Sequence, residues 1–238
     1  MNRVRSVAAM ALAGALTGAL SAWTPPALAG APMATEDADV LAPSECEWET
    51  TANRTTLSGV GGFSARTVAT KAGCGLVPGT QLGLGLARTT AEGESATGLG
   101  LTGKTALIPR RDGGFGLSLA YGFAWAKEPG DSLRYAATTL SLVATQGLGD
   151  LTLHANYGIA RVRDEDGTRG TWAVGAEYAL TPAVSALLET YGSEGNGSAW
   201  GAGLRWAASE AWSFGLMASK TLRDPRAKDV LLSAKLAF

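Results

Sequence analysis

The sequence contains little of what enzymes commonly use for chemistry. It has one histidine, two cysteines and only 17% charged residues among 238. No histidine stands at metal-ligand spacing from either cysteine, which argues against the common zinc sites. The formal net charge of −1 provides no basic surface for nucleic acid. We therefore expect no metal, no cofactor and no nucleic-acid partner.

Long apolar runs are also absent once the first 29 residues are set aside. A membrane helix needs about 20 consecutive apolar residues. The remaining chain can therefore cross a membrane only as a closed β-barrel, the other structure that satisfies every backbone hydrogen bond in lipid.

The first 29 residues are typical of a signal peptide. Arg3 and Arg5 precede an uncharged run of small apolar residues over 7–22, and a small-x-small site follows at 27–29. This order predicts export and cleavage after Ala29, with Ala31 as the nearby alternative. No cysteine occupies the cleavage position, so a lipoprotein anchor is not expected.

Residues 30–46 are rich in alanine, proline and acidic residues and show no periodicity. Such a composition favours a short, disordered segment. We interpret residues 30–46 as a periplasmic lead-in to a folded domain that spans residues 47–238.

Alternation of large and small residues dominates the rest of the chain. From Phe115 to Trp125 the odd positions are large and apolar, whereas the even positions are glycine, alanine or serine. A period of two predicts a β-strand with one apolar face. The same theme recurs between turn-forming clusters such as 77–79 and 164–167. In the sixth repeat the apolar parity changes between Tyr135 and Leu140, which predicts a β-bulge.

Twelve such strands are predicted, and ten is the alternative if the first two fold differently. They fall near 47–57, 64–77, 79–90, 95–107, 114–126, 132–145, 149–162, 170–180, 183–192, 198–207, 211–222 and 229–238. The second face of these strands carries small residues rather than the lysine and glutamate of a water-facing surface. This composition favours an all-β, closed antiparallel transmembrane barrel with its apolar face toward lipid.

The last strand carries a further signal at the carboxyl terminus. Its apolar residues alternate up to a terminal aromatic side chain, in the order Val230, Leu232, Ala234, Leu236 and Phe238. This pattern resembles the closing strand of bacterial outer-membrane β-barrels, including porin-like barrels, where the assembly machinery reads it. The resemblance implies the outer membrane of a Gram-negative bacterium, with its lipids, lipopolysaccharide and assembly machinery as partners. It leaves the solute and the oligomeric state open.

The aromatic residues fit the same topology. An even number of strands puts both ends of the barrel chain on the periplasmic side. Following the strands up and down then predicts two aromatic girdles. The outer girdle comprises Trp125, Tyr135, Trp172 and Trp200, and the periplasmic girdle comprises Trp48, Phe115, Tyr178, Trp206, Trp212 and Phe238.

The two cysteines are predicted to form a disulfide bond. A hairpin centred on Val60 places Cys46 directly opposite Cys74, because their numbers sum to 120. Directly opposed residues of an antiparallel pair lie within disulfide range, and the periplasm is oxidising. Closing this loop would contribute about 3 to 4 kcal/mol through the entropy of the unfolded chain.

Strand parity also predicts which polar side chains face the lumen. They are Lys71, Lys104, His154, Asn156, Glu177, Glu189, Arg205 and Lys235. Four basic residues outnumber two acidic ones, which predicts a weak preference for anions if the barrel is open. The alternative is a salt-bridge network that plugs the barrel.

These observations favour a narrow passive pore for small solutes. Barrels of eight strands are filled by side chains and those of sixteen leave a water channel, so about twelve strands lie between these limits. The alternative function is a non-conducting structural or interaction barrel. We expect no enzyme, because His154 is followed two residues later by Asn156 rather than the serine of outer-membrane lipid hydrolases, and the pair faces inward.

Overall fold

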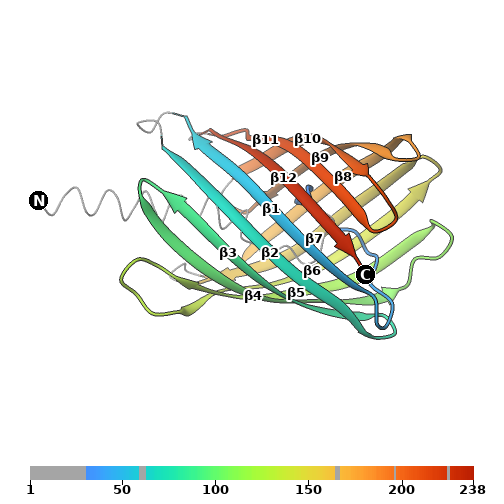
Figure 1. The fold of residues 1–238 in the computed structure, drawn as a ribbon, viewed down its shortest axis with the longest axis horizontal. Coiled ribbons are helices and arrows are strands. Elements are labelled where there is room, and N and C mark those ends of the chain that lie inside the picture. Colours follow the sequence, from blue (N-terminus) through green and yellow to red (C-terminus); the bar gives the residue numbers. More distant parts are fainter. Residues whose placement is uncertain (1–30, 59–62, 164–166, 196, 224–225) are drawn as a thin grey trace, which may run out of the picture.

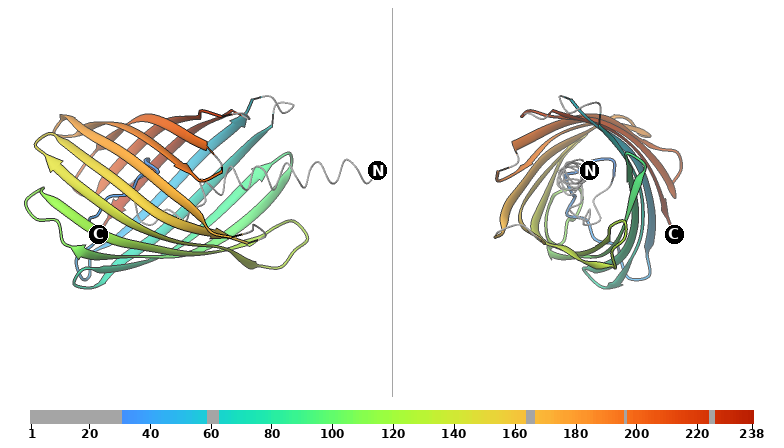
Figure 2. Two further views of the ribbon diagram at one scale, coloured as in Figure 1. Left: turned by 180° about the vertical axis from the view of Figure 1, so that it is seen from behind. Right: turned by 90° about the vertical axis from the view of Figure 1, so that its left-hand side faces the viewer.

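The computed structural model describes residues 31–238 apart from 59–62, 164–166, 196 and 224–225. The predicted signal peptide, residues 1–29, lies outside this part. Twelve strands form one closed antiparallel barrel in which each strand pairs with its neighbours in chain order and β12 pairs with β1 (Figures 1 and 2). The prediction of a twelve-stranded closed barrel is confirmed, and the ten-strand alternative is excluded.

The strands follow one another with short connections. They are β1 (Cys46–Leu57), β2 (Ser64–Val77), β3 (Thr80–Ala91), β4 (Glu94–Ile108), β5 (Phe115–Lys127), β6 (Arg134–Leu148), β7 (Leu151–Val162), β8 (Arg169–Thr181), β9 (Val184–Ser193), β10 (Gly197–Ala207), β11 (Trp212–Thr221) and β12 (Ala227–Ala237). In the described part of the chain, no helix has the length and apolar character needed to cross a membrane.

The predicted bulge lies in β6. Ala124 of β5 pairs with Ala137, but the next residue, Trp125, pairs with Tyr135, so Ala136 is the extra residue. One extra residue reverses the parity of a strand. This is why Tyr135 and Leu140, which stand at an odd and an even position, are both exposed on the outer face.

The large apolar side chains cover the outside of the barrel. Leu84, Tyr157 and Leu232 are 62%, 67% and 57% exposed. Small residues at strand positions of the opposite parity, such as Ser118 and Ala124, are fully buried. An apolar surface of this extent would be unstable in water and suits contact with lipid. The alternation that predicts the strands therefore also sets which side of the sheet faces outward.

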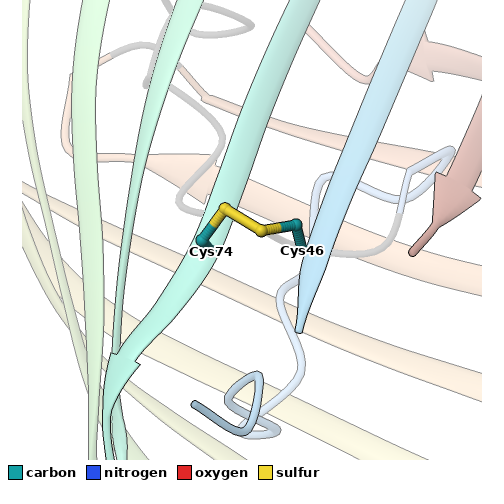
Figure 3. The surroundings of a disulfide bond; sticks show 2 residues. All are labelled: Cys46 and Cys74. Atoms are coloured by element: carbon teal, nitrogen blue, oxygen red, sulfur yellow. A yellow bond between two sulfur atoms is a disulfide. The ribbon is translucent and has the colours of Figure 1, made fainter. Parts of the chain in front are cut away.

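The disulfide prediction is confirmed. Cys46 of β1 stands opposite Cys74 of β2, and their sulfur atoms are bonded (Figure 3). The amide of Cys46 donates to the carbonyl of Phe238 at 2.8 Å, and the amide of Phe238 donates back at 2.9 Å. The disulfide therefore links β2 to the seam at which β1 and β12 close the barrel.

The segment before β1 differs from the expectation. Residues 31–45, called the luminal segment below, run through the inside of the barrel, shown in blue in the right-hand view of Figure 2, and end in exposed residues 42–45 at the barrel end where β1 begins. The interpretation of residues 30–46 as a disordered lead-in is therefore wrong for the described residues 31–45. Their composition cannot form a core of its own, but polar side chains on the barrel wall supply the partners that local sequence lacks.

Candidate functional site

The luminal segment crosses the interior from one wall to the opposite wall. Met33 packs with Leu187 of β9 and Met217 of β11. Five residues later, Ala38 packs with Ala120 of β5. In the closed ring of twelve strands, β5 and β11 are half a turn apart. The segment is therefore an internal strap held at both sides of the barrel.

Side chains of the wall accept the backbone N–H groups of this segment. Six N–H groups of the segment donate to acceptors on β1, β9, β7, β6 and β3. They are Ala31 to Glu49 at 3.2 Å, Ala34 and Thr35 to Glu189 at 3.0 and 2.8 Å, Glu36 to Asn156 at 2.6 Å, Ala38 to Thr145 at 2.8 Å and Leu41 to Gln81 at 2.7 Å. Since an unpaired buried N–H group is costly, these bonds fix the path of the segment.

Three consecutive carbonyl groups of the segment are bonded as well. Asn156 Nδ2 donates to the carbonyl of Glu36 at 3.1 Å, Lys104 Nζ donates to that of Asp37 at 2.9 Å, and Ser118 Oγ donates to that of Ala38 at 2.6 Å. Asn156 thus pairs with both the N–H and the carbonyl of one residue, as a neighbouring strand would. The wall thus forms hydrogen bonds with the backbone of the segment at three successive residues, 36 to 38.

Two acidic side chains of the segment meet basic side chains of the wall. Asp37 Oδ1 lies 3.0 Å from Lys104 Nζ, and this lysine side chain is only 1% exposed. Asp39 Oδ1 lies 3.0 Å from Arg110 Nε in a more open position. Burial alone would raise the pKa of the Asp37 carboxyl, but the adjacent Lys104 ammonium holds that pKa well below its usual range.

The side-chain carboxyl group of Glu36 lacks part of its hydrogen bonding among the described residues. Its side chain is buried, and among the described residues Oε2 has no hydrogen-bond partner. Burial raises the pKa of this carboxyl to about 8; Lys104 and Lys71 lower it in part, whereas Asp37 and Glu49 add to the increase. A carboxyl in this setting is held in its neutral form at neutral pH.

All eight side chains predicted to face the lumen lie inward and are buried or half-buried. The buried ones are Lys71, Lys104, His154 and Glu189, and the half-buried ones are Asn156, Glu177, Arg205 and Lys235. His154 Nδ1 lies 3.0 Å from the hydroxyl of Thr145, which also accepts the N–H of Ala38. Lys104, Asn156 and Glu189 contact the luminal segment directly.

The basic residues of the wall form ion pairs rather than an unpaired positive lining. Lys71 lies 3.2 Å from Glu49, Lys235 lies 3.7 Å from Glu47, and Arg205 pairs with Glu177. The sequence interpretation missed Glu47 and Glu49, although the outward Trp48 between them gave the parity. Among the described residues, no group of three or more histidine, cysteine, aspartate or glutamate side chains is arranged to hold a metal ion.

Glycines of the wall stand where the luminal segment comes closest. A Cβ atom would collide with the segment at three of them, Gly75 against Ala42, Gly175 against Met33 and Gly215 against Pro32. These glycines belong to β2, β8 and β11. The wall therefore leaves room for the backbone of the segment at Gly75 and for its side chains at Gly175 and Gly215.

The predicted girdle aromatics lie at the two ends of the barrel. Trp48, Phe115, Tyr178, Trp206, Trp212 and Phe238 are 44–66% exposed at the end where β1 begins. Tyr135, Trp172 and Trp200 are 36–45% exposed near the other end, and Trp125 is half-buried there beside Tyr135. Their contact with lipid stays a prediction.

A family model matches most of the chain. It is described as "Uncharacterised conserved protein UCP029691" and covers residues 18–238. The chain belongs to this family. A search of curated proteins finds no match to the chain.

Solved structures similar to this member of UCP029691 are outer-membrane porins and channels. The COG4313 outer membrane channel from Pseudomonas putida F1 aligns with a TM-score of 0.63 at 10% identity, covering 85% of this chain and 98% of that one. The KdgM porin aligns at 0.56 and 12% identity, with 80% and 99% coverage. The NanC porin aligns at 0.53 and 11% identity, with 79% and 98% coverage. At these identities the likeness shows a shared outer-membrane barrel fold, as the sequence predicts.

The buried Glu36 predicts that docking of the luminal segment depends on pH. Docking raises the pKa of Glu36 from 4.5 to about 8. Between these two pH values, docking of the segment takes up a proton. The equilibrium constant for docking therefore falls as pH rises, by up to about tenfold per pH unit. Asp37 has the opposite effect only below about pH 4, because docking lowers its pKa.

A nitroxide spin label attached through an Ala34→Cys substitution reports this docking in its electron paramagnetic resonance spectrum. Position 34 is exposed, and the described residues contain no free cysteine to compete for the label. We expect the mobile component of the spectrum to grow from pH 5 to 9, and Glu36→Gln to remove the change. Glu45→Gln, which alters an exposed acid of the same segment, should retain it. A pH dependence that persists in Glu36→Gln would contradict the assignment.

Proposed function

We propose that the protein is an outer-membrane channel for small solutes whose lumen is obstructed by residues 31–45 until this segment is displaced. The observation that carries the proposal is how the segment is held. All twelve strand pairs of the barrel form without it, and the described backbone bonds between it and the sheet join residues 43–45 to Gly75, at the end of the segment next to β1. The segment can therefore leave without breaking a strand–strand hydrogen bond.

The outer-membrane location is supported by three properties of the barrel. Its outer face is apolar, its exposed aromatics gather at two ends, and its fold is shared with porins and channels of the outer membrane. Lipid and lipopolysaccharide are the partners that such a surface suits. The same porin and channel neighbours favour transport over catalysis.

Displacement of the segment should also change the charge of the lumen. With the segment docked, Lys104 pairs with Asp37 and Arg110 pairs with Asp39. Departure of the segment removes these acidic partners together with Glu36. Charges that line a pore set its ion preference, so the weak anion preference inferred from the sequence belongs to the open state.

A non-conducting structural barrel is the second candidate function. It is favoured by the contacts of Met33 and Ala38 with opposite walls, which would suit a permanent plug. The two candidates differ in one property, which is whether the barrel conducts after the segment is removed.

Deletion of residues 33–41 tests the proposed channel. The deletion removes Glu36, Asp37 and Asp39 and no basic residue, and it retains residues 42–45 and both cysteines. In planar bilayers we expect a several-fold larger conductance than that of the parent, with a reversal potential shifted toward anions in a salt gradient. The shift should weaken as ionic strength rises, because salt screens exposed charges.

A second variant controls for the effects of deletion. Gly175→Leu keeps the full chain and places a side chain where Met33 and Thr35 lie, so it should raise conductance too. Asp112→Asn, on an exposed turn, should behave as the parent. If both displacing variants insert and fold, as heat-modifiable mobility shows, but conduct no more than the parent, the protein is a structural barrel.

We propose in addition that the barrel-assembly machinery recognises the last strand. The alternating residues Val230, Leu232 and Phe238 are 51%, 57% and 66% exposed. They therefore form an apolar stripe on the outer face of the last strand and are not packed in a core. The backbone of Phe238 already pairs with Cys46, and a substitution of its side chain preserves those two hydrogen bonds.

Phe238→Ser is expected to lower the amount of inserted barrel several-fold, because it removes the terminal aromatic without removing buried packing. Quantitative immunoblotting of isolated outer membranes measures the yield. Phe115→Ser is the matched control, since Phe115 is also an exposed aromatic at the same barrel end. Equal yields for the two variants would count against recognition of the terminal residue.

A further inference from the structure

The wall of the lumen has the contacts of a peptide-binding site. It accepts six backbone N–H groups of the luminal segment and donates to three of its carbonyl groups. These bonds are made to the backbone, which every peptide shares, and come from side chains on seven strands. Met33 and Ala38 pack against opposite walls. Between them the segment is held by hydrogen bonds to the wall and not by secondary structure of its own.

Side-chain contacts restrict which peptides would fit. The acids Asp37 and Asp39 stand two residues apart, and each meets its own basic partner, Lys104 and Arg110. Between them Ala38 is 1% exposed, so its position admits only a small side chain. The wall therefore favours an Asp-x-Asp sequence with a small central residue.

We propose that the lumen is a binding site for acidic peptides from solution, and that residues 31–45 are its tethered occupant. The binding atoms are those of Lys104, Arg110, Ser118, Asn156 and Glu189, with Gln81 at the far end. The inference depends on the proposed function in one respect, since an external peptide can bind only after the segment has left.

The acceptors of the wall favour a peptide over an acidic saccharide. Glu189 accepts the N–H groups of Ala34 and Thr35 and the hydroxyl of Thr35, and it is only 4% exposed. An oligosaccharide of uronic acids such as galacturonate offers Glu189 hydroxyl donors but not two consecutive amide N–H groups, and its carboxylates would be repelled by this buried carboxylate. A peptide satisfies Glu189 with backbone groups and still offers its acids to Lys104 and Arg110.

The position of Glu36 gives the proposed site a preference that a non-specific electrostatic site would not show. Its buried Oε2 lacks a hydrogen-bond partner among the described residues. A peptide with glutamine at this position avoids burying a charge. Such a peptide should therefore bind more tightly than the native sequence at pH 9, although it carries one acid fewer.

The experiment uses the barrel that lacks residues 33–41 and a synthetic, amino-terminally acetylated peptide of residues 31–43. Block of single-channel current gives one readout, and fluorescence anisotropy of the labelled peptide on the purified barrel gives another that does not require conduction. We expect saturable block that falls at least tenfold for the peptide carrying Asp37→Asn and Asp39→Asn. We expect a similar loss for Lys104→Gln in the barrel, and a gain at pH 9 for the Glu36→Gln peptide.

The outcomes separate this inference from the proposed channel. Conduction without peptide block or binding overturns the peptide site and leaves the channel intact. Absence of conduction with specific, saturable anisotropy overturns the channel and leaves the peptide site. Equal block by a peptide of the same composition in scrambled order, or by an oligogalacturonate, the ligand present in one KdgM porin structure, would show a site for polyanions in general and overturn the peptide assignment.

Discussion

The structure depends on the requirement that every strand of a lipid-embedded sheet has a partner on both sides. A sheet edge in lipid leaves backbone N–H and C=O groups unpaired, so only closure is stable. The β1–β12 seam meets this requirement through Cys46 and Phe238 and is braced by the Cys46–Cys74 disulfide. Because the strands use their backbone groups on one another, anything inside the barrel must be held by side chains.

That consequence explains the character of the lumen. The luminal segment cannot join the sheet, so its backbone is bonded to Glu189, Asn156 and Thr145 and its acids to basic side chains. Buried polar networks of this kind are stable when every member is satisfied and costly where one is not. Glu36, with its unpartnered oxygen, is the weak point at which protonation changes the stability of the docked state.

Much of the barrel could be predicted from local sequence, because side-chain alternation reports the orientation of a strand without knowledge of its partner. The parity change between Tyr135 and Leu140 predicted the bulge that the structure has at Ala136, and the hairpin register predicted the disulfide. The path of residues 31–45 could not be predicted in this way, because it has no period and its partners come from seven strands, most of them distant in sequence. The acids that pair with the inward basic residues were only partly predictable, because Asp37 lies on this segment, whereas strand parity could have placed Glu47 and Glu49 inward.

The most direct test of the account is a cross-link between the luminal segment and the wall in intact cells. Ala38 and Ala120 are each 1% exposed and pack in one cluster, so Ala38→Cys with Ala120→Cys should yield a disulfide detectable in non-reduced peptides. Ala38→Cys paired with Leu119→Cys, on the outer face of β5, should not. A protein that inserts, retains the Cys46–Cys74 bond and forms neither cross-link would contradict the placement of residues 31–45 in the lumen.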